Sequence, residues 1–316
     1  MSDYLLANYS HEYENEFMYL MIETSMGTKF DNNDKLPKCL VMVGGKPIIQ
    51  WQLEVLEKLN VKELEIVVGT SVVALVQSTI GTIKTTINIH YYPIDDIEFL
   101  HNGVALKKFR EDNRENLMKY RDVIVIGTDL LFDTTTFTNF INQHRIESSY
   151  LTLLTTEEKR PKLKKGEEFD EQRPKDLLIL NEQKRIFGMI YGNCSDKIGI
   201  PYDVLDRYPS LSIVDEIQTL RTFIVKSTVL ARMPYSDKLT SIHKDVLPHI
   251  IKLLRGKFGQ DIHEKTLNDL FNHIPSSFEP PCIYVLQKTG MTFRISQQAQ
   301  IKKVEGMVKS QKLKLF

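Results

Sequence analysis

One stretch near the start of the chain, residues 18–59, constrains the fold more than any other. Residues 18–22 (MYLMI) have the length and flanking residues of a buried strand, and a polar loop follows them. The turn at residues 43–47 (VGGKP) ends at Pro47, which suits a helix start because the N–H that proline lacks has no partner there. Apolar residues then recur every three or four positions and predict a helix with one apolar face. These residues are Ile49, Leu53, Leu56 and Leu59.

Composition narrows the class of protein. A chain of 316 residues with 42% hydrophobic residues can form one large α/β domain or two modest ones. Lysine plus arginine equals aspartate plus glutamate, at 41 each, so no overall field draws the chain to nucleic acid or to a membrane. Three cysteines that lie far apart argue against a disulfide framework or a zinc site. They are Cys39, Cys194 and Cys282. We expect a cytosolic protein, because neither a signal peptide nor an apolar run of about 18 residues is present.

The rest of the chain alternates predicted strands and helices, which favours an α/β sheet. Strands are expected at residues 64–69, 87–92, 123–126, 149–156 and 222–225, and a hairpin at 176–191. Helices are expected at residues 72–80, 135–146, 227–233 and from 246 onward. Residues 282–286 and 293–295 suggest a closing hairpin. The mixed charge run at 157–175 and the basic tail at 302–316 are interpreted as solvated segments rather than nucleic-acid contacts.

Acidic and histidine side chains supply the candidate site residues. Asp129 follows Gly127 and Thr128 just past the strand at 123–126, where a carboxylate can hold a metal ion that bridges phosphates. The alternative is that Asp129 caps the following turn or accepts a backbone N–H. Asp95 and Asp96 lie in a turn and are either metal ligands or, as is usual for adjacent carboxylates, solvated. Two further residues, His243 and His249, are six positions apart and on different helix faces, which argues against a shared metal.

Several motifs resemble those of the sugar-nucleotidyltransferases, whose pattern is a strand, A-G-G-x-G-x-R-L, and then P-K-P-L-L-P-V-x-x-K-P. Residues 36–47 (LPKCLVMVGGKP) keep the second half. Residues 102–106 (NGVAL) resemble the family's G-T-A-x-x-L helix start, and Asp129 its metal-binding position. Residues 241–251 (SIHKDVLPHII) match its S-I-x-x-D-x-x-P-x-L element. The resemblance implies a mostly parallel Rossmann-like sheet sandwiched by helices.

The glycine-rich half of that pattern has changed. Residues 23–30 (ETSMGTKF) lack the paired glycines that let a backbone approach a triphosphate, and Thr24 and Ser25 fill that space. Glu23 adds a carboxylate near the expected phosphates. Residues 192–197 (GNCSDK) stand where the family's sugar-binding V-E-K-P element is expected. The resemblance leaves a remnant nucleotide pocket, with no catalytic residue, metal or cofactor expected. Its residues are Gly27, Lys29, Lys38 and Asp129.

Within this family, the chain resembles the gamma subunits of eukaryotic translation initiation factor 2B. The likeness lies in residues 36–59, 122–133, 176–191, 211–258 and 282–295. It implies a non-catalytic subunit of a guanine-nucleotide-exchange complex that acts in translation initiation. The expected partners are the epsilon subunit, the other subunits of factor 2B and initiation factor 2, without direct nucleic-acid or membrane contact.

Domain limits follow from the same resemblance. We expect an N-terminal extension at 1–17, a nucleotidyltransferase-like domain at 18–258, a linker at 259–281, and a terminal strand segment with a basic tail at 282–316. The left-handed β-helix of hexapeptide repeats found in full members is absent from the sequence. The alternative function is an active sugar-1-phosphate nucleotidyltransferase, such as a mannose-1-phosphate guanylyltransferase. Lys29, Lys38 and Asp129 would then be its phosphate and metal groups.

Overall fold

The three-dimensional structure is a computed structural model of the 316-residue chain. It describes residues 15–23, 36–96, 101–157, 176–191, 205, 208, 210–215, 217–234, 236–255, 283–287, 292–295, 301–302 and 304–306. Within these ranges, no helix is both long enough and apolar enough to cross a membrane.

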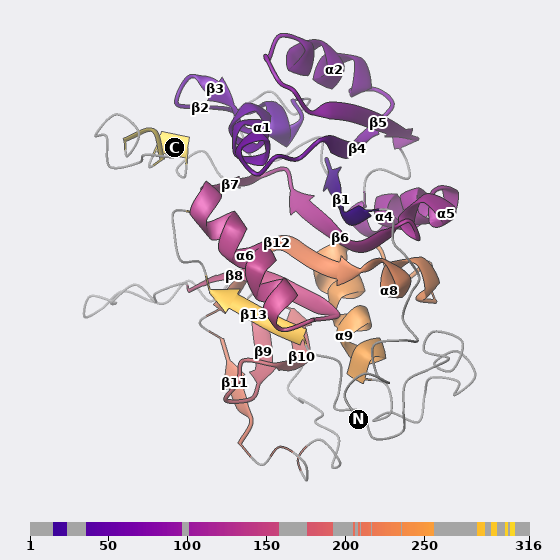
Figure 1. Cartoon of the computed structure of the whole chain (residues 1–316), viewed down its shortest axis with the longest axis vertical. Coiled ribbons are helices and arrows are strands. Elements are labelled where there is room, and N and C mark those ends of the chain that lie inside the picture. Colours follow the sequence, from indigo (N-terminus) through magenta and orange to yellow (C-terminus); the bar gives the residue numbers. More distant parts are fainter. Residues whose placement is uncertain are drawn as a thin grey trace, which may run out of the picture.

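A seven-stranded sheet forms the centre of the molecule (Figure 1). Its strands are β1 (Asn15–Ile22), β4 (Glu63–Gly69), β5 (Asn88–Ile94), β6 (Tyr120–Gly127), β8 (Leu151–Glu157), β12 (Ile217–Lys226) and β13 (Ile283–Gln287). They lie in the order β13-β8-β12-β6-β1-β4-β5. Every neighbouring pair is parallel except those made by β12, which runs antiparallel to both β6 and β8. The sheet is therefore mostly parallel, as the sequence predicted.

Both faces of the sheet are buried, and the alternation of β1 shows how. Met18, Leu20 and Ile22 point into one hydrophobic cluster, whereas Met21 points into another on the opposite face. Because successive side chains of a strand alternate between faces, a strand that is apolar at nearly every position needs cover on both sides. Helices supply that cover, and the molecule is a helix–sheet–helix sandwich.

Each helical layer presents an apolar face to the sheet. One cluster receives side chains from α1 (Ile48–Lys58), α2 (Val73–Gly81) and α6 (Thr134–Ile146). The opposite cluster receives side chains from α4 (Asn102–Asp112), α5 (Arg114–Leu117), α8 (Ser227–Arg232), the π-helical turn η2 (Ile242–Val246) and α9 (Leu247–Arg255). The predicted face of α1 is confirmed, because Ile49, Leu53 and Leu56 are buried.

Smaller elements surround the main sheet. The strands β9 (Asp176–Leu180), β10 (Ile186–Tyr191) and β11 (Ser212–Val214) form a second sheet in which β9 and β10 are the predicted hairpin. This sheet lies at the opposite end of the molecule from α2 and β5 (Figure 1). A two-residue turn joins β2 (Met42–Val43) to β3 (Lys46–Pro47). Its residues Gly44 and Gly45 have φ values of 60° and 85°, which glycine adopts without strain.

Two expectations about the chain ends differ from the structure. The segments at 283–287 and 292–294 do not form a hairpin with each other: β13 pairs in parallel with β8, and β14 (Thr292–Arg294) pairs antiparallel with β7 (Leu130–Phe132). Part of the segment expected to follow the main domain thus belongs to its central sheet. The last residues of the expected extension, 15–17, are in β1, because Asn15 and Phe17 already pair with β6.

Candidate functional site

The candidate site lies at the carboxyl ends of β1 and β6, which are parallel neighbours with Ile22 opposite Gly127. From β1 the chain moves outward to β4 and β5, and it then returns to place β6 on the other side of β1. Such a reversal of strand order leaves a crevice at the carboxyl ends, where open α/β sheets bind ligands. Glu23 directly follows β1, and Thr128 and Asp129 follow β6. The sequence prediction for the position of Asp129 is confirmed.

Glu23 is almost completely buried and is held by two backbone amides. The N–H of Lys38 donates to Oε1 and the N–H of Cys39 donates to Oε2, both at 3.0 Å. These amides belong to the short 3-10 turn η1 (Lys38–Leu40) that precedes β2. Burial raises the pKa of the Glu23 carboxyl, although the hydrogen bonds from Cys39, Thr128 and Lys38 oppose that shift. The Glu23 carboxyl group therefore takes up the N–H groups of Lys38 and Cys39, which could otherwise donate to a bound anion.

Asp129 is also buried, and two cations face its carboxylate. Nε of Arg294 donates to Oδ2 at 3.1 Å, and Nζ of Lys38 lies 3.9 Å from the same oxygen. Burial would raise the pKa of Asp129, but the charges of Arg294, Lys38 and Arg221 outweigh burial and lower it. Burial lowers the pKa of Lys38, while the nearby charge of Asp129 opposes that change. We call Glu23, Lys38, Asp129 and Arg294 the carboxyl-edge cluster.

A side chain of α1 binds the backbone on either side of Asp129. The side-chain amide of Gln52 donates to the carbonyls of Gly127 and Leu130, both at 2.8 Å, and thereby fixes the turn that carries Asp129. Arg221 lies in β12 where the register with β8 shifts, and its φ of 58° is left-handed. A Cβ on Gly127 would approach Asp129 Oδ1 at 3.3 Å and the Arg221 carbonyl at 3.5 Å. No motif in the sequence indicated the roles of Gln52, Arg221 and Arg294 at this edge.

The remnant-pocket residues predicted from sequence divide into two groups. Lys38 and Asp129 are brought together, as expected for members of one site. Gly27 and Lys29 lie outside the described residues, as do Thr24, Ser25 and the segment at 192–197. The structure therefore describes the half of the predicted site that lies in η1 and just after β6.

The alternative considered for Asp129 was that its side chain caps the following turn or accepts a backbone N–H, but the carboxylate that caps the next helix is that of Asp133. Asp133 is the N-cap of α6 and accepts a hydrogen bond from the N–H of Thr136.

Asp96, considered above as a metal ligand, accepts hydrogen bonds from the backbone N–H and the hydroxyl of Ser71. In the part of the chain that the structure describes, no three histidine, cysteine or acidic side chains cluster in a way that could hold a metal ion.

The two histidines of the segment at 241–251 have different partners. His243 is buried, with Nε2 2.7 Å from Asp176 Oδ1 and Nδ1 2.8 Å from the hydroxyl of Thr219. His249 instead places Nε2 3.1 Å from the carbonyl of Pro234. The two imidazoles therefore contact different parts of the chain. The S-I-x-x-D pattern has a local physical cause, because Asp245 accepts hydrogen bonds from the amides of Thr240 and Ser241.

Gly103, which the sequence placed at a helix start, has a packing role. Its N–H donates to the carbonyl of Thr240 at 2.8 Å. A Cβ at this position would lie 2.5 Å from the carbonyl oxygen of Leu239, so only glycine allows α4 to approach this loop.

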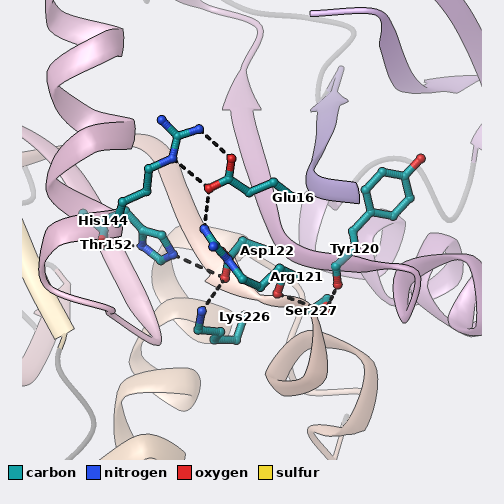
Figure 2. A network of polar contacts seen from close by, with 9 residues as sticks. Glu16, Tyr120, Arg121, Asp122, His144, Thr152, Lys226 and Ser227 are labelled. Carbon is teal, nitrogen blue, oxygen red and sulfur yellow. Dashed lines mark hydrogen bonds and ion pairs between the residues drawn. The ribbon is translucent and has the colours of Figure 1, made fainter. Parts of the chain in front are cut away.

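A second charged network lies at the amino ends of the same two strands (Figure 2). Glu16 of β1 accepts hydrogen bonds from Arg121 at 2.6 Å and from Arg145 at 2.6 and 2.7 Å. Asp122 of β6 is fully buried and lies 2.7 Å from Arg121 Nε, 3.0 Å from Lys226 Nζ and 3.3 Å from His144 Nε2. We call these residues the amino-edge network. They are Glu16, Arg121, Asp122, His144, Arg145 and Lys226.

No protein-family model matches the chain. Among solved structures, it is similar to HddC from Yersinia pseudotuberculosis complexed with GMP-PN, with a TM-score of 0.55 and 14% identity over 93% of this chain and 99% of that one. It is also similar to the inositol-1-phosphate CTP transferase from T. maritima, with a TM-score of 0.54 and 12% identity over 94% of this chain and 97% of that one. Identities this low establish a common fold and no more. The chain therefore has a nucleotidyltransferase-like fold.

Proposed function

We propose that this protein is a non-catalytic subunit of the translation initiation factor 2B complex. It would pair with the epsilon subunit and support GDP/GTP exchange on initiation factor 2 in the cytosol, together with the other subunits. The observation that carries the proposal is the position of Glu23, whose carboxylate takes the amides of Lys38 and Cys39 at the carboxyl edge of the sheet. A phosphate would have to displace that carboxylate or lie beside it.

Both ways of placing a phosphate at this edge are unfavourable. The Glu23 side chain is 1% exposed, so its displacement breaks the two hydrogen bonds that it accepts from the amides and leaves a buried carboxylate in need of new partners. A triphosphate that remained beside an ionised Glu23 would meet a like charge in a site of low dielectric constant. Nucleotidyl transfer depends on positioning and charge neutralisation, so either cost falls on transition-state binding. A scaffold role in a protein complex makes no such demand on this pocket.

The resemblance to factor 2B gamma subunits supplies the partners in this proposal. It rests on the segments at 36–59, 122–133, 176–191, 211–258 and 282–295. Two of these segments contribute to the carboxyl-edge cluster, through Lys38 and Asp129. A third, at 282–295, contributes Arg294 to the same cluster. Three of the four cluster residues, Lys38, Asp129 and Arg294, thus lie in segments that carry the resemblance.

The second candidate function is an active sugar-1-phosphate nucleotidyltransferase, such as a mannose-1-phosphate guanylyltransferase. Two observations favour it. The solved structures with this fold include one named as a CTP transferase. Lys38 and Asp129, a cation and a carboxylate suited to phosphate and metal, also lie 3.9 Å apart at the carboxyl edge.

Co-purification tests the proposed function. The full chain, tagged and expressed with the epsilon subunit and initiation factor 2, should recover both proteins at constant stoichiometry through size-exclusion chromatography. A matched bait with the same tag and an unrelated nucleotidyltransferase of this fold controls for non-specific capture. Recovery of neither partner above that control would contradict the proposal.

Pyrophosphate release distinguishes the second candidate. The purified chain, incubated with a nucleoside triphosphate, mannose-1-phosphate and Mg²⁺, should release no more pyrophosphate than a reaction without protein. Release that disappears in an Asp129→Asn variant would establish the transferase and overturn the non-catalytic role.

A further inference from the structure

Arg294 belongs to β14, and the backbone of this strand is hydrogen-bonded to β7, directly after Asp129. In the pairing of β14 with β7, Arg294 lies opposite Leu130, the residue that follows Asp129. The N–H of the next residue, Ile295, donates to the backbone carbonyl of Asp129 at 2.7 Å. Asp129 is therefore held at its carbonyl by Ile295 and at its carboxylate by Arg294. This two-point attachment sets the position of the guanidinium more closely than a long surface side chain would allow.

Apolar packing anchors the strand that carries Arg294. Ile295 is completely buried in a cluster with Val43, Ile48 and Leu131, and Phe293 packs against the same cluster. Val304, further along the chain, is buried in the same cluster. The burial of Ile295 and Val304 keeps β14 in register, which keeps Arg294 at Asp129.

The surroundings of Asp129 suit an organic cation and do not suit a metal ion. A buried carboxylate needs a partner charge, and Arg294, Lys38 and Arg221 supply it. A divalent ion needs several hard oxygen ligands, but the other nearby carboxylate, Glu23, already accepts two backbone amides. The ion would also have to displace a hydrogen-bonded guanidinium and approach Lys38. The residues present therefore do not fit a magnesium ion at this carboxylate.

We propose that Arg294 is a built-in counter-cation that takes the place of a divalent ion at Asp129 and excludes such ions from the carboxyl-edge cluster. The inference rests on the proposed non-catalytic function, and it names the residue that closes the pocket to metal. It also makes the C-terminal strand β14 part of the site. Removal of the Arg294 charge should expose Asp129 to divalent ions.

Binding of Mn²⁺, followed by electron paramagnetic resonance on the full chain, tests this assignment without nucleotide or partner. The Arg294→Met variant should bind Mn²⁺ at least about tenfold more tightly than the wild-type chain. This is the factor expected when the ion no longer has to break one hydrogen bond between a charged guanidinium and the Asp129 carboxylate. The double variant Arg294→Met/Asp129→Asn should lose the gain, because it lacks the ligand. The Arg294→Lys variant should show no gain, because it keeps the charge.

Two results would overturn the assignment. One is wild-type binding of Mn²⁺ that depends on Asp129 and is as tight as that of Arg294→Met. The other is a folded Arg294→Met variant that shows no gain even after Lys38→Met is added. If Arg294→Met does not fold, Arg294→Gln carries the same test, since it keeps a hydrogen-bond donor and removes only the charge. Because no partner or substrate enters the titration, a failed co-purification would leave its result intact.

Discussion

The amino and carboxyl ends of β1 and β6 carry the same kinds of acidic residue, but those residues have different cationic partners. At the amino edge, the acids are Glu16 in β1 and Asp122 in β6. At the carboxyl edge, they are Glu23, just after β1, and Asp129, just after β6. At the amino edge, Asp122 lies within 3.3 Å of two cations, Arg121 and Lys226, and of the His144 imidazole. At the carboxyl edge, Asp129 has one hydrogen-bonded guanidinium and one ammonium at 3.9 Å.

The difference shows why buried charge alone does not identify a functional site. Asp122 has the denser set of partners, yet it lies at the amino end of a parallel strand, away from the carboxyl ends where strand order reverses. Asp129 lies at those carboxyl ends, and its guanidinium partner comes from a strand 165 residues further along the chain. Position in the sheet therefore separates a structural network from a candidate ligand site.

Replacement of Asp122 should have the largest effect on stability. In Asp122→Asn, Arg121, Lys226 and His144 lose their shared buried charge, and we expect a loss of about 3–5 kcal/mol in the free energy of unfolding. Urea denaturation followed by circular dichroism measures the change. Asp237→Asn is the control, because that side chain is 95% exposed and should change stability little. A loss no greater than that of the control would remove the distinction between the two edges.

Replacement of Asp129 should cost less. Asp129→Asn keeps the shape of the side chain but loses the charge that Arg294 and Lys38 face, and we expect a loss of about 1.5–3 kcal/mol. The Arg294 side chain is 18% exposed and can turn partly toward water, which limits the loss. The same denaturation experiment applies. An effect larger than that of Asp122→Asn would reverse the ranking of the two edges.

Acid should weaken both edges, through the same mechanism. Burial alone would raise the pKa values of Asp122 and Asp129. The hydrogen bond from His144 and the charge of Lys226 outweigh burial at Asp122, and the charges of Arg294 and Lys38 outweigh it at Asp129, so both pKa values lie below the ordinary value of 3.8. Each carboxylate therefore contributes stability above pH 3.8 that is lost as the pH falls through its lower folded-state pKa. The free energy of unfolding plotted against pH should fall less steeply in this acid range for each asparagine variant than for the wild-type chain. Parallel curves would contradict the role of these charges.

Glu16 should show the smallest effect. Its side chain is 36% exposed, so in Glu16→Gln the broken pairs with Arg121 and Arg145 should cost no more than about 1 kcal/mol. Because exposed pairs are screened by salt, the difference from the wild-type chain should shrink at high ionic strength, whereas that of Asp129→Asn should persist. Unfolding at low and high salt concentration compares them. Equal salt dependence would indicate that the two edges are similarly solvated.

Local sequence patterns predicted most of the fold. The apolar run at 18–22, the spacing of Ile49, Leu53 and Leu56, and the hairpin at 176–191 each depend on neighbours within a few positions, and the structure confirms all three. The pair Gly44–Gly45 likewise indicated a tight turn. In the structure both residues have left-handed φ values, which glycine adopts without strain. Such features are visible in one sequence because their physical causes are local.

The candidate site was only partly predictable, because its contacts are not local. The sequence placed Asp129 at the correct edge of the sheet, but it could not show that Arg294 would pair with it. Proximity in sequence suggested that residues 282–286 and 293–295 pair with each other, whereas β13 joins β8 and β14 joins β7. Glu23 was recognised as an acidic residue near the expected phosphates, yet its bonds to the amides of η1 depend on how the chain returns after residue 35.

The central claim is that the protein's own charged groups take the positions that phosphate and metal would need at the carboxyl edge. A crystal structure of the protein soaked with a nucleoside triphosphate and Mg²⁺ tests this claim most directly. We expect Arg294 to remain hydrogen-bonded to Asp129, Glu23 to remain on the amides of Lys38 and Cys39, and no density for metal or phosphate at this edge. A magnesium ion bound to the Asp129 carboxylate, with Arg294 displaced and phosphates on those amides, would contradict the proposal.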